Sequence, residues 1–188
     1  MNLVRIFEDK NQLWCPCYSE DEDVDIFTIL LKKWDDTEYL TNFFKQNLMQ
    51  LRDPYWCGIS IDQAITLVRE ENYFLQEKLI CIAYENEPGC IGVTIESIFR
   101  PFKKHSYVVN NQFEDKAVKG KIDSIPKFLR LYGIQLADKT IVVSGGAIKL
   151  ISGMHTKELQ LERDRIRDLY NFLEKKNING WKDLNSLS

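Results

Sequence analysis

The segment TIVVSGGAIKLI, residues 140–151, decides how the second half of this 188-residue chain folds. A β-branched run leads into Gly145-Gly146, and Lys149 interrupts the apolar residues that follow. A phosphate-cradling loop is excluded because neither GxxxxGK[ST] nor GxGxxG is present, and the residues after the glycines continue as a strand-like run. The segment therefore predicts a strand that bends at Gly145-Gly146, where glycine allows a bulge or the close approach of another backbone.

A second strand-like run, FLRLYGIQL at residues 128–136, comes just before this segment. The three residues ADK between the two runs have the length of a hairpin turn. Alternation with period two places Arg130 and Tyr132 on the same face of their strand. Fixed cations on a sheet face can hold phosphodiesters, and a tyrosine can transfer a proton or stack on a base. The alternatives are a structural Arg–Tyr pair and an ordinary edge-strand lysine at Lys149.

The first half of the chain reads as a strand hairpin followed by helices. The expected bounds are residues 3–7 and 12–18 for the strands, and about 36–53 and 60–84 for the helices. Pro54 ends the first helix, and the second begins with the capping-box spacing of Ser60 and Gln63. The acidic run EDEDVD at residues 20–25 is expected to be a solvated loop, because it lacks the glycine and glutamate of a calcium-binding loop.

Short extended segments follow, and a helix closes the chain. Strands are expected at residues 90–99 and near residues 107–109, and KAVKGKI at residues 116–122 reads as a connection. Thr156 can cap a last helix that runs to about Asn177. Strands and helices in separate blocks favour the α+β class. We expect a single domain over residues 1–188, with a hairpin and helical part at 1–97 and a strand-rich core with its closing helix at 98–178.

Charge is unevenly distributed along the chain. Residues 1–99 contain 8 Lys/Arg and 18 Asp/Glu, whereas residues 100–157 contain 11 Lys/Arg and 4 Asp/Glu. A basic face of this kind favours an anionic partner such as nucleic acid, and the alternative is that the acidic and basic regions face each other. The candidate nucleic-acid-binding residues are Arg100, Lys103, Lys104, Lys119, Lys121 and His155.

Several classes of protein and site are excluded or disfavoured by composition. No run of 18 apolar residues is present, so we expect no membrane partner, and the charged N-terminus favours a cytoplasmic location over secretion. The five cysteines form no CxxC pair, Cys15-Pro-Cys17 fits zinc spacing poorly, and we expect reduced thiols. Two histidines, His105 and His155, are too few to indicate a triad. No motif indicates a metal or another cofactor.

Residues 128–178 resemble a group of uncharacterised Bacteroidetes-type cytoplasmic proteins. The shared pattern is R-L-Y-x-I, then V-x-x-G-G-A-I-K-L, then a closing helix after H-T-x-E-L. That pattern is similar to the core hairpin of RelE/ParE-type toxins of toxin–antitoxin pairs, over about residues 98–175. The resemblance implies a small twisted antiparallel sheet packed by helices, with a RelE-like core in the C-terminal half and an N-terminal hairpin and helices added.

The resemblance also implies an activity, namely mRNA cleavage without metal, in which basic and aromatic side chains assist attack by the 2′-hydroxyl. Arg130 and Tyr132 match the first strand of that family, and Lys149 matches the lysine of its second strand. These three residues are the candidate catalytic set. RNA, the ribosome and a cognate antitoxin-like protein are the implied partners. The chain departs from the family in its length, its acidic charge and its lack of a recognisable C-terminal catalytic residue.

Two other functions fit the sequence. One is a non-enzymatic interaction protein whose acidic N-terminal half docks on a basic partner, or covers the basic face of its own chain. The other is an RNA-binding module without catalysis. An enzyme predicts that Arg130, Tyr132 and Lys149 converge on one exposed pocket, whereas the other two functions do not require this.

Overall fold

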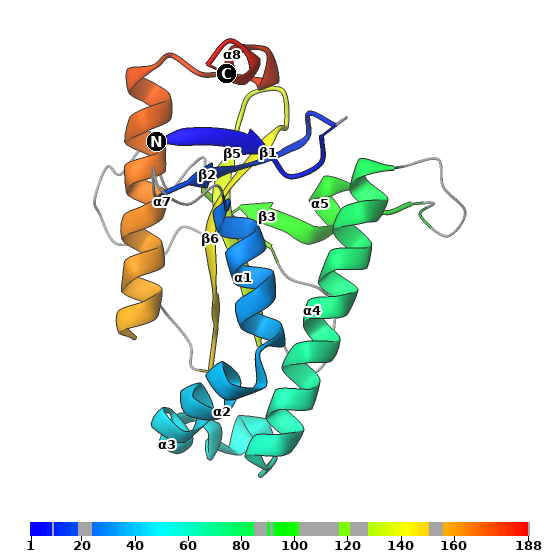
Figure 1. The fold of residues 1–188 in the computed structure, drawn as a ribbon, viewed down its shortest axis with the longest axis vertical. Helices are drawn as coiled ribbons and strands as arrows, with labels where there is room; N and C mark the ends of the chain where they lie inside the picture. Colours follow the sequence, from blue (N-terminus) through cyan, green and yellow to red (C-terminus); the bar gives the residue numbers. More distant parts are fainter. Residues whose placement is uncertain are drawn as a thin grey trace.

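The fold is built on one mixed six-stranded sheet, seen in a computed structural model of the chain (Figure 1). The structure describes residues 1–8, 10–18, 24–84, 90, 92–101, 117–120, 128–150 and 156–187. The strands are β1 Asn2–Arg5, β2 Leu13–Cys17, β3 Phe99–Pro101, β4 Ala117–Gly120, β5 Leu129–Gln135 and β6 Ile141–Ile148. The helices are α1 Ile26–Asp35, α2 Thr37–Gln46, α3 Leu48–Leu51, α4 Ile61–Ala83, α5 Ile95–Ile98, α7 Lys157–Lys175 and α8 Trp181–Asn185, with a 3₁₀ turn at Pro54–Trp56. Fold class is therefore α+β, as the sequence predicts.

Strand order in the sheet is β1-β2-β6-β5-β4-β3. The predicted β5–β6 hairpin forms, with Arg130 opposite Ala147 and Tyr132 opposite Gly145. The N-terminal hairpin joins the same sheet, because β2 pairs with the start of β6 through Leu13 opposite Ile141. That pairing is parallel, so the expectation of a purely antiparallel sheet is corrected here. Parallel pairing needs a long crossover, and the whole stretch between β2 and β6 supplies it.

Helices cover both faces of the sheet. On one face, α1, α2 and α4 pack against apolar side chains such as Leu13, Leu131 and Val143. On the other face, α7 and α8 pack against Trp14, Ile134 and neighbouring residues. Figure 1 shows α7 on one side of β6 and α1 with α4 on the other. Every residue of β6 is buried, which explains why it reads as a continuous apolar run rather than an alternating one.

The bend predicted at Gly145-Gly146 is a β-bulge. Tyr132 pairs with Gly145 and Gly133 pairs with Val143, so Ser144 is the additional residue on β6. The two glycines themselves are required by contact on opposite faces. A Cβ atom on Gly146 would lie 2.7 Å from Cη2 of Trp34 and 2.8 Å from the carbonyl oxygen of Arg130. Gly145 lies under the carboxylate of Glu162 on α7 in the same way.

Two helix starts predicted from capping residues in the sequence have the expected caps in the structure. Ser60 and Gln63 form the predicted capping box at the start of α4. Thr156 caps α7 by accepting a hydrogen bond from the backbone N–H of Leu159 at 3.3 Å. The helix α1 was missed, although Asp25 caps it by accepting from the backbone N–H of Thr28. Asp25 is the last residue of the acidic run EDEDVD, and that run predicts a loop rather than the start of a helix.

Three further expectations need correction. Residues 90–99 were expected to be extended, but the short helix α5 occupies residues 95–98 before β3 begins. Part of the segment that reads as a connection, residues 117–120, forms β4 and pairs with β5. The thiols are not all reduced, because Cys81 and Cys90 form a disulfide with their Cα atoms 4.8 Å apart. The strand expected near residues 107–109 lies outside the described residues.

The thiol of Cys15 is buried and takes part in a hydrogen bond within the fold. It donates to Oδ1 of Asp25 at 3.2 Å, and burial raises its pKa far above that of a free thiol. Among the residues that the structure describes, no three His, Cys, Asp or Glu side chains are placed to hold a metal ion. In the same part of the chain, no helix has the length and apolar character needed to cross a membrane.

We predict that Gly146→Ala destabilises the protein by roughly 1–3 kcal/mol, because the added methyl overpacks a rigid site. Trp34, which it would meet, is only 1% exposed and cannot turn into solvent. Urea unfolding followed by circular dichroism measures the effect. Asn42→Ala, on the exposed side of α2, is the matched control and should change stability by less than about 0.5 kcal/mol. Equal stabilities of the two variants would contradict this account of β6.

Candidate functional site

Two of the three candidate catalytic residues lie together on the α7 face of the sheet. Arg130 and Tyr132 belong to β5 and point to the same side, as their spacing predicts. Arg130 is half-buried, and its guanidinium donates to the carbonyl of Leu129 at 2.6 Å. Tyr132 is 2% exposed. Burial raises the pKa of its hydroxyl, although the positive charge of Arg130 opposes this shift.

Lys149 follows directly after β6 and continues the same hairpin. Its backbone N–H donates to the carbonyl of Phe128 at 2.7 Å, and its side chain is half-buried. Because Ile148 and Leu150 pack into the core beneath α1 and α4, alternation turns Lys149 toward the α7 face. The backbone register therefore places all three candidate residues on one face of the hairpin. The burial of Tyr132 means that they do not line one exposed pocket.

The remaining candidate residues come from segments that the structure describes only in part. Arg100 and Lys119 stand opposite each other in the β3–β4 ladder, so the backbone brings these two basic positions together at the far edge of the sheet. Their side chains are outside the described set. Lys103, Lys104, Lys121 and His155 lie outside the described residues altogether, as does His105.

The residue at the centre of the α7 face is Glu162, which sequence reasoning missed. Its side chain is 3% exposed and its carboxylate lies directly over Gly145. Oε1 accepts from the guanidinium of Arg165 at 2.5 Å, whereas Oε2 is buried and has no hydrogen-bond partner in the described part of the chain. Burial raises the pKa of Glu162 to about 7 and outweighs the opposing charge of Arg165.

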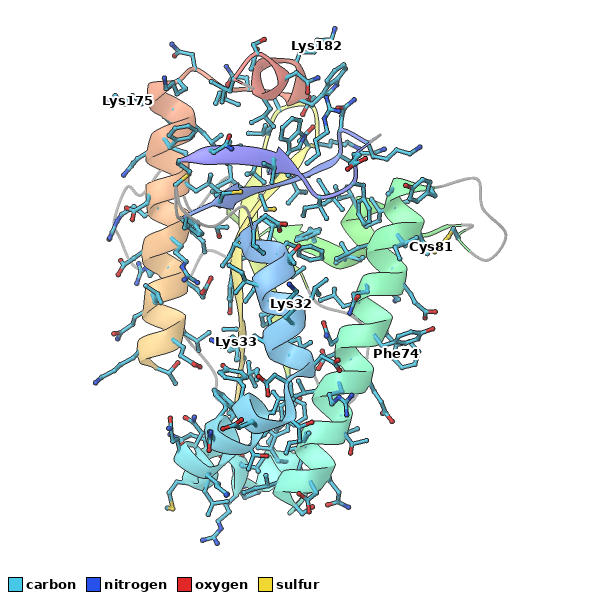
Figure 2. The ribbon with its side chains drawn as sticks, viewed as in Figure 1. Lys32, Lys33, Phe74, Cys81, Lys175 and Lys182 are labelled. Carbon is cyan, nitrogen blue, oxygen red and sulfur yellow. A yellow bond between two sulfur atoms is a disulfide. The ribbon has the colours of Figure 1, made fainter. Side chains whose placement is uncertain are left out.

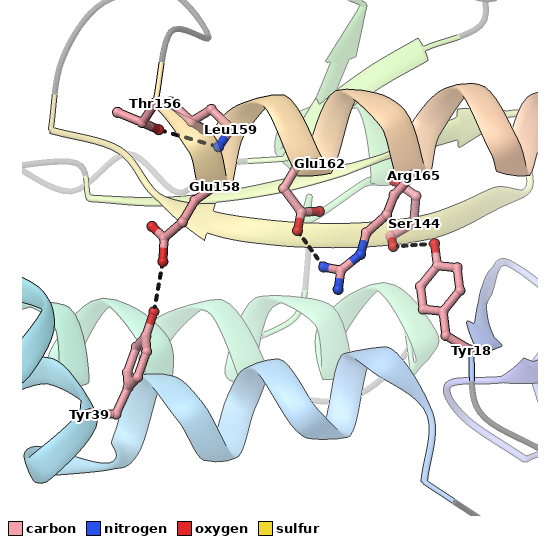
Figure 3. Close-up of polar contacts among 8 residues, drawn as sticks. All are labelled: Tyr18, Tyr39, Ser144, Thr156, Glu158, Leu159, Glu162 and Arg165. Carbon is pink, nitrogen blue, oxygen red and sulfur yellow. Dashed lines mark hydrogen bonds and ion pairs between the residues drawn. The ribbon is translucent and has the colours of Figure 1, made fainter. Parts of the chain in front are cut away.

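Tyr18, which follows β2 directly, contacts the residues around Glu162. The hydroxyl of Tyr18 donates to the carbonyl of Ser144 at 2.7 Å, and the guanidinium of Arg165 stands 5.4 Å from the centre of the Tyr18 ring (Figure 3). Ser144 is fully buried, and its hydroxyl oxygen has no partner among the described residues. Two polar side-chain atoms, one on Glu162 and one on Ser144, are therefore orphaned near the bulge.

One turn earlier on α7, a second carboxylate joins the helical layer. Tyr39 of α2 donates to Oε1 of Glu158 at 3.5 Å, which links α2 to the start of α7 (Figure 3). Burial raises the pKa of Glu158, and the charge of Lys33 on α1 lowers it. Lys33 also acts on Glu162 in the same direction, and its ammonium stands 4.4 Å from the Tyr39 ring centre. Polar groups of α1, α2 and α7 thus meet beside β6.

Chemically, this arrangement can hold and release a proton near neutral pH. It is less suited to catalysis on a large substrate, because Glu162, Tyr132 and Ser144 are each at most 3% exposed. A signal for Glu162 was present in the sequence, since it occupies the apolar stripe of α7 three residues after Leu159 and four before Ile166. A charged residue at such a position must find a buried partner.

A different surface is open to solvent, on the outer side of α4. Four large apolar side chains are exposed there: Tyr73 by 59%, Phe74 by 50%, Ile80 by 48% and Tyr84 by 38%. Tyr73, Ile80 and Tyr84 are spaced by seven and four residues, so they follow one side of the helix. Figure 2 shows Phe74 on the side of α4 that faces away from the sheet. We call these four residues the α4 surface.

Carboxylates lie within the α4 surface. Glu70 and Glu77 are exposed at positions one turn before Tyr73 and one turn after it. The hydroxyl of Tyr73 interacts with Glu77, which raises the pKa of that tyrosine. Arg69 pairs with Asp35 on α1 at 2.9 Å. Lys78, which follows Glu77 and is half-buried, is the one cation between Tyr73 and Tyr84. The α4 surface therefore combines apolar side chains with two glutamates and one lysine.

Comparisons with family models, with curated proteins and with solved structures find no match for this chain.

We predict that Glu162 makes stability depend on pH. The folded state keeps the Glu162 proton up to about pH 7, whereas the unfolded chain releases it near 4.5, so stability falls as pH rises between these values. Glu162→Gln removes this loss. The variant should therefore gain roughly 1–3 kcal/mol relative to wild type between pH 5 and 8, as measured by urea unfolding at each pH.

Asp164→Asn is the control for the loss of one negative charge on α7, since Asp164 is exposed and pairs with Arg167 across one turn. Its stability relative to wild type should change little over the same pH range. A pH profile of Glu162→Gln that runs parallel to the wild type would contradict the assignment of a neutral, buried carboxyl group.

Proposed function

We propose that this chain is a protein-binding protein whose α4 surface docks a basic, amphipathic segment of a partner. The observation that carries the proposal is the exposure of Tyr73, Phe74 and Ile80 on α4 and of Tyr84 at its C-terminal cap. Monomeric proteins rarely leave such side chains together in water, and contiguous apolar patches usually mark interaction sites. Tyrosine and phenylalanine are also enriched where partners bury their energetic centres.

The charge of the α4 surface indicates the chemistry of the partner. Glu70 and Glu77 would face lysine or arginine side chains, while Tyr73, Phe74 and Ile80 would cover apolar residues of the same segment. An amphipathic helix presents both kinds of residue at matching intervals. A second copy of this chain is disfavoured, because two α4 surfaces in contact would bring four glutamates together.

We expect Phe74→Ser to weaken binding of the partner at least about tenfold, because a half-exposed aromatic side chain is lost from the contact. A photo-crosslinking amino acid at position 74 identifies the partner in cells, and calorimetry with the purified partner then measures affinity. Binding should also weaken as salt is raised, and Glu77→Gln should reduce this salt dependence.

Met49→Ser is the matched control, since Met49 is 78% exposed and belongs to another helix, α3. A crosslinker at position 49 should not capture the same partner. If the purified partner binds wild type, Phe74→Ser and Met49→Ser with equal affinity, the α4 surface is not the docking site.

Metal-independent RNA cleavage of the RelE type is a second proposal. The observation in its favour is the register of β5 and β6, which turns Arg130, Tyr132 and Lys149 to one face of the hairpin. The closed surroundings of Tyr132 favour the first proposal over this one. In the enzyme reading, the half-buried cations Arg130 and Lys149 would hold the scissile phosphate, and the protein would be active without any divalent ion.

If the enzyme reading holds, induced wild-type protein arrests growing cells and cleaves messenger RNA in the presence of EDTA. Lys149→Ala should then lose cleavage by a factor of about 100 or more, because a cation at the developing charge is removed. Primer extension on a defined transcript measures the cleavage. Equal harmlessness of wild type and Lys149→Ala to growing cells, with intact transcripts in both, would exclude this reading.

A further inference from the structure

A cleft of about 550 Å³ opens at the end of the sheet where the two hairpin turns lie, next to the C-terminal end of α4. Figure 1 shows the β5–β6 turn beneath α8 and the β1–β2 turn beside it. The lining residues are Lys10, Asn11, Gln12, Ile82, Thr94, Ile95, Asp138, Lys139, Thr140 and Trp181. A cleft of this volume falls in the range of small-molecule sites in proteins.

The charged groups of the cleft favour an anionic ligand. Lys10 and Lys139 reach it from the two different turns. The ammonium of Lys10 stands 5.1 Å from the ring centre of Tyr84, which helps to fix its position beside α4. Lys139 has a φ of 71°, so the tight turn itself sets the direction of its side chain.

Asp138 is the one carboxylate among the described residues of the lining, and it already accepts two hydrogen bonds. Oδ1 accepts from the backbone N–H of Thr140 at 3.0 Å, and Oδ2 accepts from that of Trp181 at 2.8 Å. A Cβ atom on Gly180 would lie 2.5 Å from Oδ2, so glycine is needed for this approach. Asp138 therefore ties α8 to the β5–β6 turn and places Trp181 in the wall of the cleft.

The rest of the wall supplies apolar contact. Ile82 and Ile95 line the cleft together with the half-exposed ring of Trp181, and the ammonium of Lys182 stands 5.8 Å from the centre of that ring. Asn11 and Gln12 also line the cleft, but their side-chain oxygens are buried and are not exposed to a ligand in it.

We propose that the cleft binds a mononucleotide, with its phosphate facing Lys10 and Lys139 and its base against Trp181. A nucleotide combines the two properties that the lining favours, namely an anionic group and a flat ring. Inorganic phosphate matches only the first of these properties, and an uncharged nucleoside matches only the second. None of the described lining residues belongs to the α4 surface or to the hairpin face, although Lys10 also contacts the ring of Tyr84.

The test is calorimetric titration of the full chain with the four ribonucleoside monophosphates, with inorganic phosphate and with adenosine. We expect at least one nucleotide to bind with a Kd below about 1 mM, and phosphate and adenosine each to bind at least tenfold more weakly. Lys139→Asn, which suits the positive φ at this position, and Lys10→Gln should each raise the nucleotide Kd about tenfold or more.

Lys175→Gln is the matched control, because it removes one exposed lysine from the end of α7 and should leave the Kd unchanged (Figure 2). Thermal unfolding of each variant verifies that it is folded before titration. The proposal is overturned if no nucleotide binds the wild type at millimolar concentration, if phosphate alone binds equally well, or if folded Lys139→Asn and Lys10→Gln both bind like Lys175→Gln.

Discussion

The structure depends on the burial of β6 on both faces at once. A strand between two helical layers can form its backbone hydrogen bonds only with neighbouring strands of the sheet. Its side chains must fit the space that the helices leave. Gly146 admits the Trp34 ring from α1, and Gly145 admits the Glu162 carboxylate from α7. Neither glycine has a side chain, so α1 and α7 can each come close to β6 at these positions. Gly145 and Gly146 therefore set how closely the two helices pack on the strand.

Buried polar groups then fix how the long helix α4 meets the sheet. The carboxylate of Glu71, which is 2% exposed, accepts from the backbone N–H groups of Phe128 and Leu129 at 2.7 and 3.1 Å. The indole of Trp56 donates to the carbonyl of Leu150 and stacks on Phe128 with ring centres 4.4 Å apart. These bonds anchor the outer ends of β5 and β6, where an apolar contact alone would allow sliding. They give the hairpin a defined register against α4.

The features that could be predicted from the sequence are those set by neighbours in the chain. The β5–β6 hairpin, the Ser60–Gln63 capping box and the shared face of Arg130 and Tyr132 all follow from local spacing. The parallel pairing of β2 with β6 joins residues about 128 positions apart, and no local pattern encodes it. The Cys81–Cys90 disulfide joins residues only 9 positions apart, but its spacing matches no CxxC motif that would mark it in the sequence. For Glu162 and Glu71, the sequence shows a charge within an apolar stripe but not the partner that makes its burial tolerable.

The same architecture explains why the hairpin that dominates the sequence is a poor place for an accessible site. A strand that two layers enclose gains stability from the exclusion of water, and the polar groups nearest to it, Glu162 and Ser144, share that exclusion. A partner or ligand must therefore be met by groups that stand outside the layers. The outer side of α4 and the turns at the end of the sheet meet this condition. Each is attached to the core, but its exposed side chains cover little of the apolar surface of the core. In this protein, strong sequence signals mark packing, and the surfaces open to binding are formed by residues with weak sequence signals.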